Sequence, residues 1–266
     1  MTSATHSTTI SRLTAIAANT FREAVRDRVL YNLIVFALVL VGAAVLFGQI
    51  SIGIEKIVLI NLGLTAISLF GILIAIFIGI GLVSKEIDKR TLYTVLSRPV
   101  RRWEFIVGKF LGLSGTLVVN TSLMALGFFA ALFYVTHGFS AQDVSLLAAL
   151  YFIVLQFVLM TALALLFSSF STPIESSVLA FAFFVIGSFA EELRSFAAMV
   201  TGVTRWASAA VAYIVPNFAA LNVISPVAHG EAVSGRLLLF NTIYTLLYAA
   251  AAISGAVLIF DRRDLK

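Results

Sequence analysis

The charged side chains of this chain gather between Lys85 and Lys109. This stretch holds ten of the thirty-one Lys, Arg, Asp and Glu residues in a chain of 266 residues that is 61% hydrophobic. Charges this dense could catalyse a reaction, bind a phosphate or hold a partner. Each would cost roughly 2.5–3.5 kcal/mol at the centre of a bilayer. The stretch must therefore lie in water or against another protein.

Enzyme chemistry does not fit the residues present. Gly108 and Lys109 resemble the end of a phosphate-binding loop, but Trp103 stands where its first glycine is needed and Phe110 where a Ser or Thr is needed. The histidines fall in the tail and in outer loops, which excludes an intramembrane haem or a serine-protease base. They are His6, His137 and His229. With no Cys and no H-E-x-x-H, we expect no catalytic residue, cofactor or metal in this chain.

The elements that position the charged stretch are membrane spans. A mean hydropathy of +1.05 and 12% charged residues are typical of an integral membrane protein. A span needs about 20 apolar residues. Six segments are interpreted as spans: 29–48, 57–83, 110–136, 144–170, the short 174–190, and 237–260. The sequence therefore predicts an all-α, polytopic membrane protein with six transmembrane helices.

Residues 206–228 are the ambiguous segment. They are uncharged and long enough to cross, but Pro216 and Pro226 interrupt them. We interpret them as re-entrant or interfacial, within an outer-face segment at 191–236. A seventh span would also place the basic C-terminal residues outside, against the positive-inside rule. Six spans put 14 of the 18 Lys and Arg residues inside, with both termini cytoplasmic.

The N-terminal region has two parts. Residues 1–10 form a polar tail that we expect to be disordered, and residues 11–266 form one membrane domain. In residues 11–30 apolar and charged side chains alternate at helical spacing, which predicts an amphipathic helix on the inner membrane surface. The plainer alternative is a helical extension of the first span.

Two rows of small residues mark places where helices can approach closely. One row is Gly71, Ala75 and Gly79, and the other includes Gly108 and Gly112. Small residues four apart lie on one helix face and allow tight packing in lipid. The rows could serve packing within this chain or a dimer interface.

The polar residues expected inside the spans do not titrate near neutral pH. They are Asn61, Asn120, Gln156, Asn241 and Tyr244. Carriers driven by protons or ions usually need Asp, Glu, His or Arg at this depth. A channel or ion-driven carrier is therefore disfavoured.

The charged stretch resembles the first cytoplasmic loop of the type-2 ATP-binding-cassette (ABC) transporter permeases. That pattern has an acid at the end of a span, a basic residue with Thr-Leu, a short helix, Pro-Val with basic residues, and Gly-Lys opening the third span. The matching residues are Glu86, Arg90, Thr91, Leu92, Pro99, Val100, Arg101, Gly108 and Lys109. Residues 166–184 resemble the junction of spans four and five. The phrases LSRPV and GKFLG are similar to permeases encoded with nitrous-oxide-reductase maturation systems.

The resemblance implies that residues 84–109 form a cytoplasmic coupling loop. Residues 90–96 can form a short helix that ends before Pro99. Its apolar side chains would enter a groove on a soluble ATPase, and its charges would fix the register. The docking residues would be Glu86, Arg90, Thr91, Leu92, Tyr93, Leu96, Arg98, Pro99, Arg101 and Lys109.

The resemblance also implies the partners and the location. Two ATPase subunits would bind ATP and Mg²⁺, and a second permease, identical or related, would complete a transporter in a prokaryotic inner membrane. The surroundings would be lipid, with no nucleic acid. Export is the implied direction, and the cargo could be a lipid, peptide, amphiphile or polysaccharide. The alternative is a non-transporting anchor or regulatory subunit of a larger complex, with the charged stretch acting only as a topological anchor.

Overall fold

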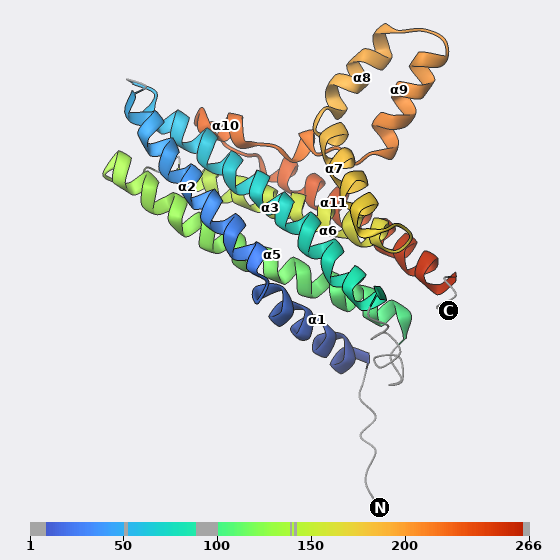
Figure 1. Cartoon of the computed structure of the whole chain (residues 1–266). Helices are drawn as coiled ribbons and strands as arrows, with labels where there is room; N and C mark the ends of the chain where they lie inside the picture. The colour runs from blue at the N-terminus through green and yellow to red at the C-terminus, as the bar shows by residue number, and fades with distance from the viewer. Residues whose placement is uncertain (1–8, 51–52, 89–100, 139, 141–142, 263–266) are drawn as a thin grey trace, which may run out of the picture.

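A computed structural model describes residues 9–50, 53–88, 101–138, 140 and 143–262. Every regular element in those ranges is a helix (Figure 1). In chain order they are α1 (Thr9–Val25), α2 (Arg28–Ile50), α3 (Glu55–Asp88), α5 (Arg102–Thr136), α6 (Val144–Ser168), α7 (Pro173–Ser188), α8 (Ala190–Met199), α9 (Val203–Ile214), the 3-10 turn η2 (Ala219–Leu221), α10 (Ile224–Ala228) and α11 (Gly235–Arg262). The all-α prediction is confirmed.

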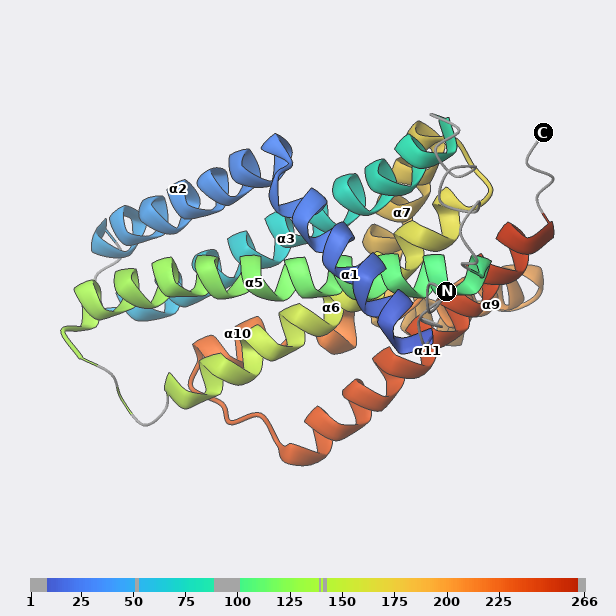
Figure 2. The ribbon, with the colours of Figure 1, turned by 90° about the horizontal axis from the view of Figure 1, so that it is seen from below.

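The long helices α2, α3, α5, α6 and α11 run together as an oblique bundle (Figures 1 and 2). The start of α1, the end of α3, the start of α5 and the end of α11 lie toward one end of the bundle. The two described ends of the charged stretch therefore lie at the same end of the bundle as the start of α1 and the end of α11.

The core of the bundle is formed by α3 and α6. Away from the charged ends of α3, both helices are apolar on all sides, so neither has a polar face that would need water. In the most apolar 18-residue stretch of α6, 78% of the residues are buried, against 22% in the corresponding stretch of α2. The outer helices thus present their apolar residues to the surroundings, as a protein in lipid must.

Five of the six predicted spans lie on single helices. They correspond to α2, α3, α5, α6 and α11. The fifth predicted span, 174–190, differs because α7 ends at Ser188 after 16 residues and meets α8 at a bend of 62°. The carbonyl of Gly187 accepts a bond from the N–H of Phe218 at 3.0 Å, so a contact from a distant segment lies beside the bend.

Six described helical segments are long and apolar enough to cross a membrane, and the bent pair α7–α8 would be a seventh. One of the six is Val203–Ala228, which contains the segment predicted to be re-entrant. Its helix stops at Ile214 and resumes only as η2 and the short α10, so it is not one straight span.

The structure describes the two ends of the predicted loop 84–109. Helix α3 continues to Asp88 and α5 begins at Arg102, so both ends of the expected loop are helical. Residues 84–88 contain no Gly or Pro that would end a helix. At the N-terminus, the predicted helix of residues 11–30 is two helices, because α1 ends at Val25 and α2 begins at Arg28.

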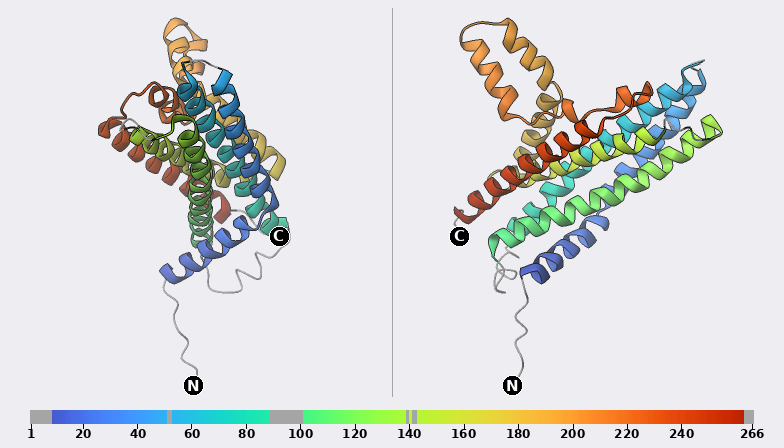
Figure 3. Two further views of the ribbon diagram at one scale, coloured as in Figure 1. Left: turned by 90° about the vertical axis from the view of Figure 1, so that its left-hand side faces the viewer. Right: turned by 180° about the vertical axis from the view of Figure 1, so that it is seen from behind.

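Helices α8 and α9 form a hairpin that projects sideways from the bundle (Figure 3). They pack against each other and are joined by a turn in which Gly202 has a φ of +72°. The hairpin is the part of the outer-face segment 191–236 that lies farthest from the core, whereas η2 and α10 pack back against α6.

Candidate functional site

The first turn of α5 follows the charged stretch directly and is fixed by Glu104. The Glu104 carboxylate accepts a hydrogen bond from the backbone N–H of Arg101 at 3.0 Å, and an acid in the first turn also suits the helix dipole. Glu104 is fully buried and lies 3.5 Å from the Arg12 guanidinium of α1. A buried carboxylate needs such a partner, because desolvation of an unpaired charge is costly.

A second ion pair lies further along the same two helices. The Lys109 ammonium is 3.7 Å from the Glu23 carboxylate and 5.7 Å from the centre of the Phe105 ring. Its side chain is only 2% exposed. Because α1 offers a base and then an acid while α5 offers an acid and then a base, a shift of register would separate both pairs. We call Arg12, Glu23, Glu104 and Lys109 the α1–α5 clamp.

Glycines allow the two helices of the clamp to meet. A Cβ atom on Gly112 would lie 2.5 Å from the Ala17 carbonyl oxygen, and one on Gly108 would lie 2.6 Å from the Ile16 side chain. Only glycine permits backbones this close. This row of small residues therefore packs within the chain, and a further role in a dimer stays a prediction.

The other row of small residues lies between the two core helices. Gly71 of α3 faces the ring of Phe157 on α6, and Gly79 lies against Ala164. Ala75 is buried between them. Here too the described contacts are internal to the chain.

The first turn of α5 also holds the last turn of α11. The Arg102 guanidinium donates to the carbonyl oxygens of Phe260 and Asp261, each at 2.9 Å. Carbonyls at a helix end lack intrahelical donors, so a cation there is favourable. The rings of Phe105 and Phe260 stack 5.9 Å apart. The start of α5 is thereby joined to α1 on one side and to α11 on the other.

The predicted docking residues are only partly within the described ranges. Arg90, Thr91, Leu92, Tyr93, Leu96, Arg98 and Pro99 lie outside them. Glu86 belongs to the last turns of α3. Arg101 is exposed, whereas Lys109 is turned toward α1 and buried. Lys109 thus holds α1, and its role in docking stays a prediction.

Comparison with known families agrees with this architecture. The family model described as ABC-2 family transporter protein matches residues 14–265. The chain belongs to the ABC-2 transporter family. The match extends from within α1 to beyond the last described turn of α11, so it covers the core, the hairpin and every clamp residue except Arg12. No curated protein matches the chain.

ABC-2 proteins are the membrane components of ABC transporters, so this multi-pass protein is a transport subunit. The predicted family is confirmed. The family also implies ABC ATPase subunits as partners.

The sequence identified the polar residues within this ABC-2 bundle, but it did not predict the groups to which they donate and from which they accept hydrogen bonds. Gln156 of α6 donates to the carbonyl of Leu221 and accepts from the Ser68 hydroxyl, both at 2.9 Å. Asn241 of α11 donates to the carbonyl of Ala220 at 3.1 Å. The backbone around η2 is irregular, and in a membrane its free polar groups must be satisfied by protein.

Two tyrosines of α11 complete this support. The Tyr244 hydroxyl accepts from the N–H of Asn217 at 2.8 Å, and the Tyr248 hydroxyl donates to the carbonyl of Ile214 at 2.5 Å. Three of the five predicted intramembrane polar residues thus bind one broken segment. Such support is needed by any broken segment inside a membrane, so the re-entrant interpretation stays a prediction.

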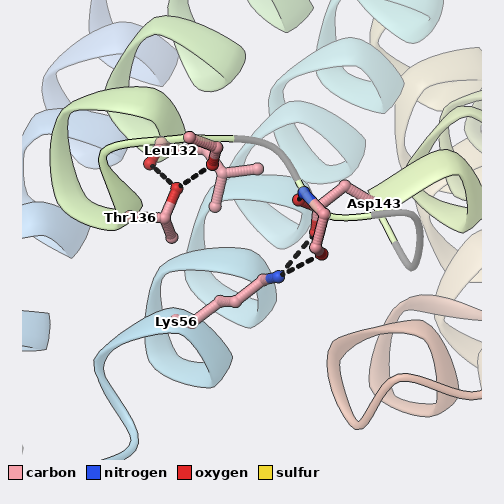
Figure 4. Close-up of polar contacts among 6 residues, drawn as sticks. Lys56, Leu132, Thr136 and Asp143 are labelled. Atoms are coloured by element: carbon pink, nitrogen blue, oxygen red, sulfur yellow. Dashed lines mark hydrogen bonds and ion pairs between the residues drawn. The ribbon is translucent and has the colours of Figure 1, made fainter.

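The opposite end of the bundle from the clamp carries another ion pair, between α3 and the start of α6 (Figure 4). The Lys56 ammonium lies 2.6 Å from the Asp143 carboxylate and 3.2 Å from the Ser140 hydroxyl. Beside it is a pocket of about 250 Å³ that also reaches His229 after α10. The charged residues that flank these spans can be recognised in the sequence, but only the folded structure shows that Lys56 pairs with Asp143.

The ion pair sets the protonation of Asp143. Burial raises the pKa of this carboxyl, but hydrogen bonds from Lys56 and Ser140, with the attraction of the ammonium, outweigh it, so the pKa lies below the ordinary 3.8. The Ser140 N–H donates to the same carboxylate at 2.7 Å. Asp143 is therefore ionised at neutral pH and holds α3 to α6.

Proposed function

We propose that this protein is the permease subunit of an ABC exporter whose energy comes from ATP hydrolysed in a separate ATPase docked on residues 85–109. Two ATPase subunits and a second permease, identical or related, complete the proposed assembly. The location is a prokaryotic inner membrane with both termini in the cytoplasm, supported by the 14 of 18 basic residues that six spans place inside.

The observation that carries this proposal is the attachment of α5 at the end of the charged stretch. Any displacement of residues 89–100 is transmitted to Arg101 and Glu104 through the polypeptide itself. Glu104 and Lys109 are bound to α1, and Arg102 is bound to the end of α11. A partner that moves the loop would move three helices together, because packed helices shift as rigid elements.

The subtype and cargo are finer proposals. The nitrous-oxide-reductase-maturation type is supported only by the shared phrases in the charged stretch. A hydrophobic cargo is favoured by the 23 Phe residues and by the absence of charge in the predicted spans other than Glu175, which lies at the inner boundary of the fifth span. The alternative of a non-transporting anchor predicts the same bundle without an ATPase bound to it.

Affinity purification of the chain from its native membrane tests the proposal. The co-purifying proteins are identified, and ATPase activity is measured for the wild type and for Glu86→Ala with Arg90→Ala. A matched control, Glu231→Ala with Arg236→Ala, removes one acid and one base from the outer-face segment.

We expect a stoichiometric ATPase with a Walker motif in the wild type and the control, and its loss or uncoupling in the loop variant. An intact protein that purifies in another assembly, without an ATPase, would overturn the exporter and favour the anchor. An ATPase that binds equally well to all three proteins, with unchanged activity, would reject the loop as the docking site.

A further inference from the structure

The α8–α9 hairpin carries a pocket away from the α1–α5 clamp. The pocket lies between the two helices and has a volume of about 190 Å³. It is lined by Arg194, Ala197, Ala198, Arg205, Ala209 and Tyr213, and we call it the basic pocket. Alanines at the helix contact leave room, and each helix contributes one guanidinium.

The charge of the basic pocket is uncompensated. Its lining contains no carboxylate. The nearby Glu191 and Glu192 line a different pocket. Among the residues that the structure describes, neither guanidinium is paired with an acid. Two positive groups around one hollow repel each other, so a bound anion would stabilise the arrangement.

The geometry of Arg194 favours a phosphate among anions. Its guanidinium carbon lies 5.6 Å from the centre of the Tyr213 ring, and this contact orients the planar group. A planar guanidinium presents paired N–H donors that match two oxygens of a phosphate. With Arg205 on the facing helix, a phosphate would be held from both sides.

The surroundings of the pocket point to a lipid as the source of the phosphate. Trp206 follows Arg205 and is 78% exposed, and Tyr213 and Val203 are also largely exposed. Trp and Tyr concentrate at the headgroup level of membranes. Pockets for whole drug-sized ligands occupy about 300–1,000 Å³, so the basic pocket fits a headgroup and not an entire molecule.

We propose that the basic pocket binds the phosphodiester headgroup of an anionic membrane lipid. The acyl chains would then lie along the exposed apolar side chains of the hairpin. This inference does not depend on the ATPase partner or on the cargo. It predicts that the hairpin selects anionic over zwitterionic lipid.

The test uses Trp206 as the reporter. The chain has two tryptophans, so Trp103→Phe leaves Trp206 as the single emitter. The full-length variant is placed in phosphatidylcholine bilayers containing an equal small fraction of either brominated phosphatidylglycerol or brominated phosphatidylcholine. Bromine quenches tryptophan on contact. We expect an apparent affinity about tenfold higher for the brominated anionic lipid, the ratio given by one strong charge-assisted contact.

Three comparisons decide the result. Arg194→Gln with Arg205→Gln should abolish the preference, Arg205→Lys should reduce it, and the control Arg236→Gln should retain it. Equal quenching by both lipids, or an equal loss in the Arg236→Gln control, would overturn the proposal. If inorganic phosphate relieved the quenching, the pocket would bind free phosphate and the lipid source would be rejected.

Discussion

Replacing Gln156 with Leu tests whether the broken segment around η2 is held by side chains. Leucine keeps the approximate volume of glutamine but can neither donate to Leu221 nor accept from Ser68. Both bonds are 2.9 Å long and lie in the buried core of the bundle. The change should therefore release the segment without opening a large cavity.

The magnitude follows from the number of bonds lost. A hydrogen bond in a protein contributes about 0.5–1.5 kcal/mol net, so two contribute about 1–3 kcal/mol. Bonds between membrane helices average about 0.6 kcal/mol, which favours the lower end. Because 1.4 kcal/mol corresponds to a factor of ten, we expect the population of the open segment to rise about tenfold.

The absence of cysteine from the natural chain provides the assay. Val223→Cys places a single thiol at a buried position beside η2, close to valine in size. The rate of its modification by a water-soluble maleimide reports how often the segment opens. We expect about a tenfold faster rate when Gln156→Leu is added.

Asn120→Leu is the matched control. Asn120 is also a buried amide, on α5, but its side-chain nitrogen has no hydrogen-bond partner among the described residues. Its replacement should leave the modification rate of the Val223→Cys thiol nearly unchanged. Equal rates in the two leucine variants would refute the inference that Gln156 holds the segment.

Three further outcomes are expected. Gly112→Ala should destabilise the protein by about 1–3 kcal/mol by overpacking against α1, whereas Gly115→Ala, whose Cβ would lie 3.9 Å from the nearest side chain, should not lower the melting temperature. Asp143→Asn should lower stability by about 1 kcal/mol at neutral pH. Because the folded pKa of Asp143 lies below 3.8, the wild-type advantage should persist above that value and disappear as the pH falls below it; a constant difference in melting temperature would contradict this. Arg102→Gln should speed hydrogen exchange in the last turn of α11 about tenfold, and unchanged exchange there would show that the two carbonyl contacts are dispensable.

Local sequence signals predicted much of the fold. Long apolar runs located α2, α3, α5, α6 and α11, because a span must satisfy its backbone within the helix. The predicted span 174–190 begins one residue after the start of α7 at Pro173. There the N–H of Thr172 donates to the Glu175 carboxylate at 3.1 Å, as is typical of a helix N-terminus.

Long-range contacts were not predictable in the same way. The bend follows the Gly187–Ser188 pair, a local feature common at kinks, but the contacts of Gly187 come from residues 215–218, which the local sequence does not predict. Likewise, the charges of Arg12 and Glu104 are plain in the sequence, but their pairing depends on how α1 crosses α5. The row that includes Gly108 and Gly112 indicated a close contact without naming its partner.

The α1–α5 clamp also has a consequence for how the protein is made. A chain is synthesised from its N-terminus, so α1 emerges before the residues of α5 exist. Until then Arg12 and Glu23 lack the partners that they have in the folded bundle, and the apolar face of α1 has only the membrane surface to cover it. Docking of α1 must therefore wait for the insertion of α5. If α5 fails to insert, α1 stays undocked on the membrane surface. The exposed amphipathic helix would then distinguish an incompletely assembled chain from a folded one.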